Sequence, residues 1–171
     1  MVNKKATAIV QARMGSTRCP GKSMELKKGI PVLEIVLKRL TYANRISKIV
    51  LATTERDIDA ILAETAKKNG ISVYRGDEND LVERFLSAAN EYADEEFIVR
   101  VAADNVFIDW EEIDRVVECG LSGGYDYVGF ANNVYPDRIS DFSGEFIRLE
   151  ALHKLSELTD DQHDREHVYS F

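Results

Sequence analysis

Short apolar segments alternate along this chain with longer segments whose apolar residues recur at helical spacing, and no other feature of the sequence restricts the fold as much. Four apolar runs of four to six residues predict buried strands over residues 6–11, 48–53, 71–74 and 97–102. The segments between and after them predict helices over residues 31–44, 57–69, 80–92 and 109–122. Parallel strands joined by helical crossovers form a sheet covered on both faces, so we expect an α/β fold with a doubly wound, mainly parallel sheet.

A smaller set of elements completes the expected domain. Residues 125–130 and 145–147 predict two further strands, and residues 149–158 predict a helix. The chain has 171 residues and contains no Pro-rich or Ser-rich linker and no internal repeat, so we expect a single domain over residues 1–171. Ligands of such sheets bind beyond the carboxyl ends of the strands, which directs attention to the segments that follow the strands.

The net charge of −8 argues against two classes of partner. Thirty Asp and Glu residues outnumber 22 Lys and Arg residues, so the surface as a whole repels nucleic acid and anionic membranes. The apolar stretch near the N-terminus is too short for a signal peptide or a membrane span, so we expect a cytoplasmic protein without a membrane partner. Cys19 and Cys119 belong to no metal-binding motif and are expected to be free thiols.

The segment after the first predicted strand is rich in small residues and cations. It contains two glycines, two hydroxyl residues and three cations, namely Gly15, Gly21, Ser16, Thr17, Arg13, Arg18 and Lys22. Glycines allow backbone amides to approach a ligand, hydroxyl groups add donors, and the cations neutralise phosphates. The segment is therefore predicted to bind a polyphosphate. It is no Walker loop, because that motif requires a glycine where Ser16 stands, and the alternative is a solvated basic loop.

Asp104 directly follows the fourth predicted strand. Mg²⁺ is commonly held by one or two carboxylates together with phosphate oxygens, so this carboxylate is a candidate ligand for a nucleotide-bound Mg²⁺. The alternative is that Asp104 caps the helix that begins near Trp110, although Asp109 suits that position better.

Two other motifs have competing interpretations. Arg75 follows the third predicted strand and either contacts a nucleotide or pairs with Asp77 or Asp80. The segment 57–59 reads Asp-Ile-Asp and has the spacing of the metal motif of glycosyltransferases, but it lies at a predicted helix start.

Motifs that cover nearly the whole chain resemble those of one known family. In order, they are AIVQARMGSTRCPGK, IVLATT, YRGDENDLVERF, VRVAADNVFID, YDYV, YP and DREHV. This series resembles the cytidylyltransferase-like family of bacterial spore coat polysaccharide biosynthesis protein F, which is related to the CMP-KDO and acylneuraminate cytidylyltransferases.

The resemblance implies a Rossmann-like fold of the nucleotide-diphospho-sugar transferase type, which binds CTP or a related nucleotide with Mg²⁺ and activates a sugar or sugar acid for polysaccharide synthesis. In this family the sugar hydroxyl attacks the α-phosphate and expels pyrophosphate. Carried over by position, Ala12, Arg13 and Met14 contact the nucleotide, as the loop chemistry also suggests for its neighbours Gly15 and Ser16. Arg18 and Lys22 then bind the phosphates, and Asp104 binds the metal.

The chain departs from the family pattern at three places. It has Ala102-Ala103 before Asp104 where relatives have Thr-Gly or Gln-Gly, so the base is left open. It has Ser143 and Glu145 where relatives have Asp-x-Glu, so the sugar is left open. The family continues into a segment with a second metal ligand whereas this sequence ends at Phe171, so we expect that segment to be missing, with Asp141 or Glu145 as candidate substitutes.

These features predict a Mg²⁺-dependent nucleotidyltransferase, most simply a cytidylyltransferase. Two other functions are compatible with the sequence. One is a nucleotide-binding domain without turnover, and the other is a glycosyltransferase that consumes nucleotide-sugars. A homodimer is also compatible with the sequence.

Overall fold

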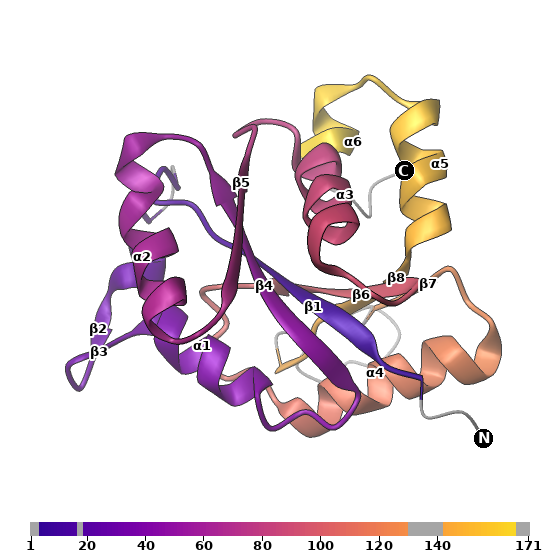
Figure 1. The fold of residues 1–171 in the computed structure, drawn as a ribbon, viewed down its shortest axis with the longest axis horizontal. Coiled ribbons are helices and arrows are strands. Elements are labelled where there is room, and N and C mark those ends of the chain that lie inside the picture. The colour runs from indigo at the N-terminus through magenta and orange to yellow at the C-terminus, as the bar shows by residue number, and fades with distance from the viewer. Residues whose placement is uncertain (1–3, 17–18, 130–141, 167–171) are drawn as a thin grey trace.

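A computed structural model of the chain describes residues 4–16, 19–129 and 142–166. Its centre is a six-stranded sheet in the order β5-β4-β1-β6-β8-β7 (Figure 1). The strands are β1 Ala6–Gln11, β4 Ile46–Thr54, β5 Ser72–Gly76, β6 Phe97–Ala102, β7 Tyr127–Val128 and β8 Glu145–Arg148. β1 pairs in parallel with β4 and β6, and β4 pairs in parallel with β5, whereas β8 is antiparallel to both β6 and β7. The predicted mainly parallel α/β sheet is confirmed.

Helices cover both faces of the sheet. They are α1 Val32–Leu40, α2 Ala60–Lys68, α3 Leu81–Tyr92, α4 Trp110–Gly123, α5 Leu149–Leu158 and α6 Gln162–Glu166. One core packs Leu37 of α1, Leu62 of α2 and Val117 of α4 against the sheet, and the other packs Phe85 of α3 and Leu152 of α5. Burying a side chain of this size stabilises a fold by about 1.5–3 kcal/mol. The two cores fix which helix ends reach the carboxyl edge of the sheet.

The helix termini near that edge follow their sequence signals. Asp80 caps α3 by accepting a hydrogen bond from the amide of Glu83 at 2.9 Å, and Asp109 caps α4 by accepting one from the amide of Glu111 at 2.8 Å. At the opposite edge, where β5 begins, Gly70 has a φ of 73° and ends α2 in the left-handed conformation. The helix α4 is therefore capped by Asp109, and the alternative role of Asp104 as its cap does not apply.

The segment between β1 and α1 differs from the prediction. It contains the short 3-10 helix η1 (Lys22–Met24) and a hairpin of β2 (Leu26–Lys27) and β3 (Ile30–Pro31), joined by Lys28 and Gly29, which both have positive φ. Pro31 belongs to β3, so α1 begins one residue later than predicted. Elements of two or three residues carry no periodic signal, which is why the pattern missed them.

Other boundaries move by a few residues. β4 has nine residues instead of six, and the predicted helix start at residue 57 is the 3-10 helix η2 (Asp57–Asp59), with α2 following it. Of the predicted strand over 125–130, residues 127–128 form β7, and residue 130 lies outside the described ranges. None of the helices in the part of the chain that the structure describes has the length and apolar character needed to cross a bilayer.

Candidate functional site

The carboxyl ends of β1, β4, β5 and β6 meet at one edge of the sheet. Gln11 at the end of β1 is in register with Ala52 of β4 and Ala102 of β6, and Thr54 of β4 is in register with Gly76 of β5. The segments after these strands therefore lie together, as expected for a ligand site in a parallel sheet.

The base of the loop after β1 is held by buried polar groups. Ala12 is 6% exposed, its amide donates to the carbonyl of Ala52, and its carbonyl accepts a hydrogen bond from Oγ1 of Thr53 at 2.9 Å. The amide of Met14 donates to Oδ1 of Asp59 at 2.6 Å. Ala12 and Met14 were predicted to contact the nucleotide. Because these backbone groups are already engaged, such contacts would use other atoms of the two residues, and the contacts stay predictions.

Asp59 holds the loop after β1 from the interior of the protein. Its side chain is buried, with 1% exposure of the residue, and its second oxygen, Oδ2, accepts a hydrogen bond from Oγ1 of Thr54. Both carboxylate oxygens are thus used inside the protein. The interpretation of segment 57–59 as an exposed metal motif of a glycosyltransferase is wrong, because Asp59 faces the loop backbone.

The loop closes on itself at its two ends. The amide of Gly21, with a φ of 71°, donates to the carbonyl of Met14 at 3.0 Å. Oγ of Ser16 accepts a weak hydrogen bond from the amide of Cys19 at 3.4 Å, so this hydroxyl faces its own loop. Cys19 and Cys119 are free thiols, as predicted, and the structure places both at exposed positions. Thr17 and Arg18 lie outside the described residues, and the role of Arg18 stays a prediction.

Gly15 lies beside an ion pair from two other loops. Nη1 of Arg56 is 2.7 Å from Oε1 of Glu78, and a Cβ added at Gly15 would lie 3.3 Å from that Nη1. A larger residue at position 15 would therefore press on this pair. Gly15 allows the loop to pass closely over the segments that follow β4 and β5.

Lys22 and Asp104 come together across the edge. Nζ of Lys22 lies 2.5 Å from Oδ2 of Asp104, and both side chains are about one-third exposed. The pair joins the loop after β1 to the end of β6. Both groups are accessible to solvent, so each can give up the other when a ligand binds. The mobile Lys22 ammonium can then bind a phosphate, and the Asp104 carboxylate can bind a metal ion.

The donor set at Asp104 is compatible with Mg²⁺ in one specific way. Among residues 4–16, 19–129 and 142–166, no group of three or more His, Cys, Asp or Glu residues could hold a metal. Asp104 nevertheless already accepts a cation, since it binds the Lys22 ammonium. A Mg²⁺ held there would need phosphate oxygens and water for its remaining ligands, which is the usual arrangement for nucleotide-bound Mg²⁺.

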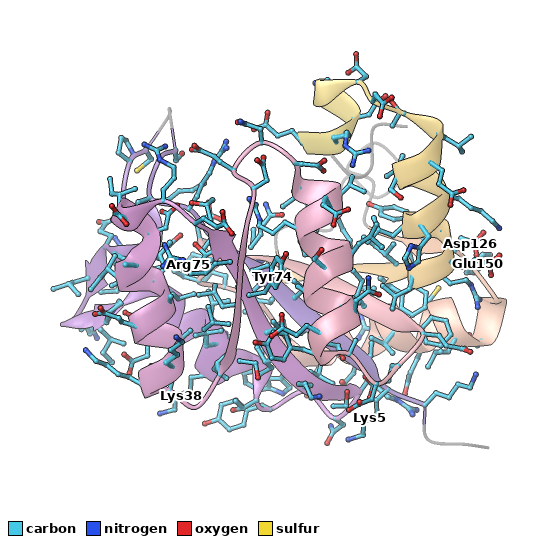
Figure 2. All side chains as sticks on the ribbon, turned by 45° about the horizontal axis from the view of Figure 1, so that its top comes forward. Lys5, Lys38, Tyr74, Arg75, Asp126 and Glu150 are labelled. Carbon is cyan, nitrogen blue, oxygen red and sulfur yellow. The ribbon has the colours of Figure 1, made fainter. Side chains whose placement is uncertain are left out.

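Arg75 lies on β5 next to Tyr74 (Figure 2). Its Nε donates to the carbonyl of Thr54 at 2.9 Å, and its Nη2 donates to the carbonyl of Arg56 at 2.8 Å. The predicted alternative, an ion pair with Asp77 or Asp80, is wrong, because the guanidinium tethers the chain after β4. The predicted nucleotide contact of Arg75 is untested by this geometry.

Arg84 is a buried cation that the sequence reasoning missed. The residue is 4% exposed, its Nη1 donates to the carbonyl of Asp77 at 2.7 Å, and its Nε has no hydrogen-bond partner. Burial lowers the pKa of the Arg84 guanidinium, and the nearby charge of Arg13 lowers it further. The available signal was its position between Leu81 and Phe85 on the apolar stripe of α3, where an arginine is unusual.

A second set of hydrogen-bonded polar side chains crosses the sheet next to the site. Nε of Arg100 donates to Oε1 of Gln11 at 2.9 Å, and Nη1 of Arg100 lies 2.6 Å from Oε2 of Glu145. The Glu145 carboxylate is thus paired with an arginine that is only 13% exposed and is also bound to Gln11, whereas the Lys22 partner of Asp104 is one-third exposed, and the use of Glu145 as a substitute metal ligand stays a prediction. The other candidate substitute, Asp141, lies outside the described residues.

Proteins with similar sequences and folds point to one family. A sequence model described as cytidylyltransferase matches residues 7–168. The chain is 35% identical over 165 residues to the uncharacterized protein MJ1063 of Methanocaldococcus jannaschii, covering 96% of this chain and 65% of that protein. It is 34% identical over 128 residues to the spore coat polysaccharide biosynthesis protein SpsF of Bacillus subtilis, covering 72% of this chain and 53% of that protein. The chain therefore spans less than two thirds of the length of either relative.

A more distant relative is 3-deoxy-manno-octulosonate cytidylyltransferase of Trichlorobacter lovleyi, 28% identical over 111 residues, which are 65% of this chain and 43% of that protein. Among solved structures, a cytidylyltransferase from Leptospira borgpetersenii superposes with a TM-score of 0.88 at 34% identity, covering 98% of this chain and 70% of that one. CMP:2-keto-3-deoxy-manno-octonic acid synthetase complexed with CTP shares the fold, with a TM-score of 0.72 at 13% identity over 97% of this chain and 83% of that one. On the match over residues 7–168, the chain belongs to the cytidylyltransferase family.

Proposed function

We propose that the chain binds CTP at the carboxyl edge of the sheet and transfers its cytidylyl group to a sugar or sugar acid. The observation that carries this proposal is the Lys22–Asp104 pair, 2.5 Å apart, at the mouth of a loop that closes through the amide of Gly21. A closed loop with an exposed cation, facing a carboxylate, matches the two needs of a nucleoside triphosphate, which are charge neutralisation and a metal ligand.

The reaction needs little covalent chemistry from the protein. A sugar hydroxyl oxygen forms a bond to the α-phosphorus while its proton passes to solvent, the bond from that phosphorus to its bridging oxygen breaks, and pyrophosphate leaves. Lys22, Arg13 and Arg18 would bind the phosphate oxygens on which negative charge develops. Positioning and electrostatic stabilisation of this kind dominate nucleotidyl transfer. Mg²⁺, held by Asp104, would supply additional positive charge when bound.

The relatives support a sugar as the acceptor. One is named for spore coat polysaccharide biosynthesis, and another is a cytidylyltransferase that acts on 3-deoxy-manno-octulosonate, a sugar acid. We therefore propose that the acceptor is a sugar or sugar acid destined for a surface polysaccharide. CTP is preferred over other nucleotides on the same ground, and a cytoplasmic location is proposed because CTP is available there.

Thermal-shift titration with CTP, UTP, GTP and ATP, with and without Mg²⁺, tests the binding step. A ligand at 100 times its dissociation constant raises the free energy of unfolding by about 2.7 kcal/mol. For a chain of this size that corresponds to a rise in melting temperature of roughly 5–10 °C. We expect CTP with Mg²⁺ to give the largest rise. The absence of a rise with all four nucleotides would contradict the proposal.

Pyrophosphate release with a panel of sugars and sugar acids tests turnover. CTP binding together with acceptor-dependent release of pyrophosphate is the expected result. CTP binding without release for any acceptor would favour the alternative of a nucleotide-binding domain without turnover.

A further inference from the structure

The short helix α6 is fixed to the helix α3 by one arginine. Nε of Arg165 donates to Oδ2 of Asp80 at 2.7 Å, and its Nη1 donates to the carbonyls of Ser156 and Thr159 at 3.1 and 3.0 Å. The Arg165 side chain is 17% exposed. Asp80 also caps α3, so the cap of one helix anchors the other. Figure 1 shows α6 beside the N-terminal end of α3, on the side of the sheet that carries α5.

The next residue of α6 reaches the loop after β1. Nη2 of Arg13 lies 2.9 Å from Oε1 of Glu166, across 153 positions of sequence. Both side chains are between one third and two fifths exposed. The anchored helix therefore presents a carboxylate to a cation of the candidate phosphate site.

A second positive charge lies in the neighbourhood of Arg13. The buried Arg84 lies close enough to Arg13 for the two positive charges to disfavour each other. Arg13 has a long side chain and is partly exposed, so without a counter-charge it would turn away from Arg84 and into solvent. The hydrogen bond to Glu166 offsets this repulsion and fixes the direction of the guanidinium.

We propose that Glu166 is a positioning residue, which holds the Arg13 guanidinium in place to bind the phosphates of the nucleotide. A guanidinium has five N–H groups, so one bond to Glu166 leaves donors for phosphate oxygens. The proposal rests on the proposed function, since it takes Arg13 as a nucleotide contact.

A competing role for Glu166 predicts a change in nucleotide affinity of the opposite sign. If Glu166 competed with phosphate for Arg13, removing its negative charge would strengthen nucleotide binding. The three bonds of Arg165 favour positioning, because they hold α6 in place and a competing carboxylate would have to withdraw when nucleotide binds.

The test is a double-mutant cycle on CTP affinity, measured by calorimetry in the presence of Mg²⁺. Glu166→Gln keeps the size of the side chain and removes its charge, and Glu157→Gln on α5, an exposed position, is the matched control. We expect Glu166→Gln to weaken CTP binding about fivefold, and Glu157→Gln to change it less than about 1.5-fold. In an Arg13→Met background, Glu166→Gln should have no further effect, because it acts through Arg13. Without nucleotide, the melting temperature of Glu166→Gln should stay within about 2 °C of the parent, since the ion pair is partly exposed.

Each other outcome is decisive. Tighter or unchanged CTP binding by Glu166→Gln overturns the positioning role, while the proposed function stands as long as the parent chain binds CTP. An equal loss in the Arg13→Met background shows that Glu166 does not act through Arg13 and also overturns it. A parent chain that binds none of the four nucleotides contradicts the proposed function and the positioning role together.

Discussion

The amide of Met14 donates a 2.6 Å hydrogen bond to Oδ1 of Asp59, a residue that is 1% exposed and belongs to the 3-10 helix η2. This bond places a buried negative charge under the start of the loop after β1. The same carboxylate accepts a hydrogen bond from Thr54. The loop is thereby held by the interior of the protein, and its cations remain available at the surface.

Replacement of Asp59 by Ala should destabilise the whole chain. The substitution leaves the buried Thr54 hydroxyl and the partly buried Met14 amide without their acceptor, which costs about 2–4 kcal/mol of unfolding free energy. Urea denaturation measures this change. Asp57→Ala, at an exposed position two residues earlier, is the control and should change the free energy by less than about 0.5 kcal/mol. Equal effects of the two substitutions would show that Asp59 has no special role in holding the loop.

Lys22→Ala should weaken CTP binding and leave the fold intact. A charge-assisted contact to phosphate is worth roughly 1.5–3 kcal/mol, which corresponds to a loss of about 10- to 150-fold in affinity. The Lys22–Asp104 pair is one-third exposed, so its loss should cost at most about 1 kcal/mol of stability. Calorimetric titration and thermal melting check the two parts. Lys27→Ala, in the nearby hairpin, removes the same charge from an exposed side chain and should leave CTP affinity unchanged.

Asp104→Asn should separate metal-dependent from metal-free binding. The amide keeps the shape of the side chain and loses the charge that holds a hard cation, so the gain in CTP affinity on adding Mg²⁺ should shrink. Metal-free affinity should hold or rise, because Lys22 no longer has a carboxylate partner 2.5 Å away. Titrations with and without EDTA measure both quantities, with Glu64→Gln on α2 as an exposed control. If metal-free binding fell as much as metal-dependent binding, Asp104 would be a structural residue.

Arg84→Met should loosen the loop between β5 and α3. The substitution removes the hydrogen bond from Nη1 to the Asp77 carbonyl, and the loss of a bond to a charged group costs about 1.5–3 kcal/mol. Part of this cost is recovered because the guanidinium is buried and its Nε has no partner. Hydrogen exchange should quicken at the amides of Asn79 and Asp80, which donate to the Asp77 side chain. Unchanged exchange there would mean that Arg84 does not order this loop.

Sequence reasoning found the long elements because each carries its own signal. The apolar runs of β1 and β6 are correct to the residue, and α3 begins one residue after its cap at Asp80. Asp80 and Asp109 could be identified as caps because a cap and its helix are adjacent in sequence. The hairpin between β1 and α1 could not be predicted, because its strands have only two residues each.

The sequence predicted which residues belong to the site better than it predicted their contacts with one another. Lys22 and Asp104 were both identified, each from the strand that precedes it, but their direct pairing depends on the parallel register of β1 and β6. Asp59 was considered only as part of a metal motif and Glu166 only as part of the DREHV motif, and their contacts with the loop after β1 were missed for the same reason. Each acts on the loop from 45 or 153 positions away, a separation at which no local pattern links two residues.

The reversed direction of β8 brings a late part of the chain to the candidate site. β8 is antiparallel to β6, so β8 starts at the edge where β6 ends. The residue before it, Gly144, passes so close to β6 that an added Cβ would lie 2.7 Å from the carbonyl oxygen of Arg100. Just upstream, the carbonyl of Phe142 accepts a hydrogen bond from the amide of Asp109 at 2.6 Å. Two segments that are far apart in the sequence thus border the same edge of the sheet. Substitutions in the later segment, residues 142–144, can therefore change the surroundings of Asp104 while the loop after β1 stays unchanged.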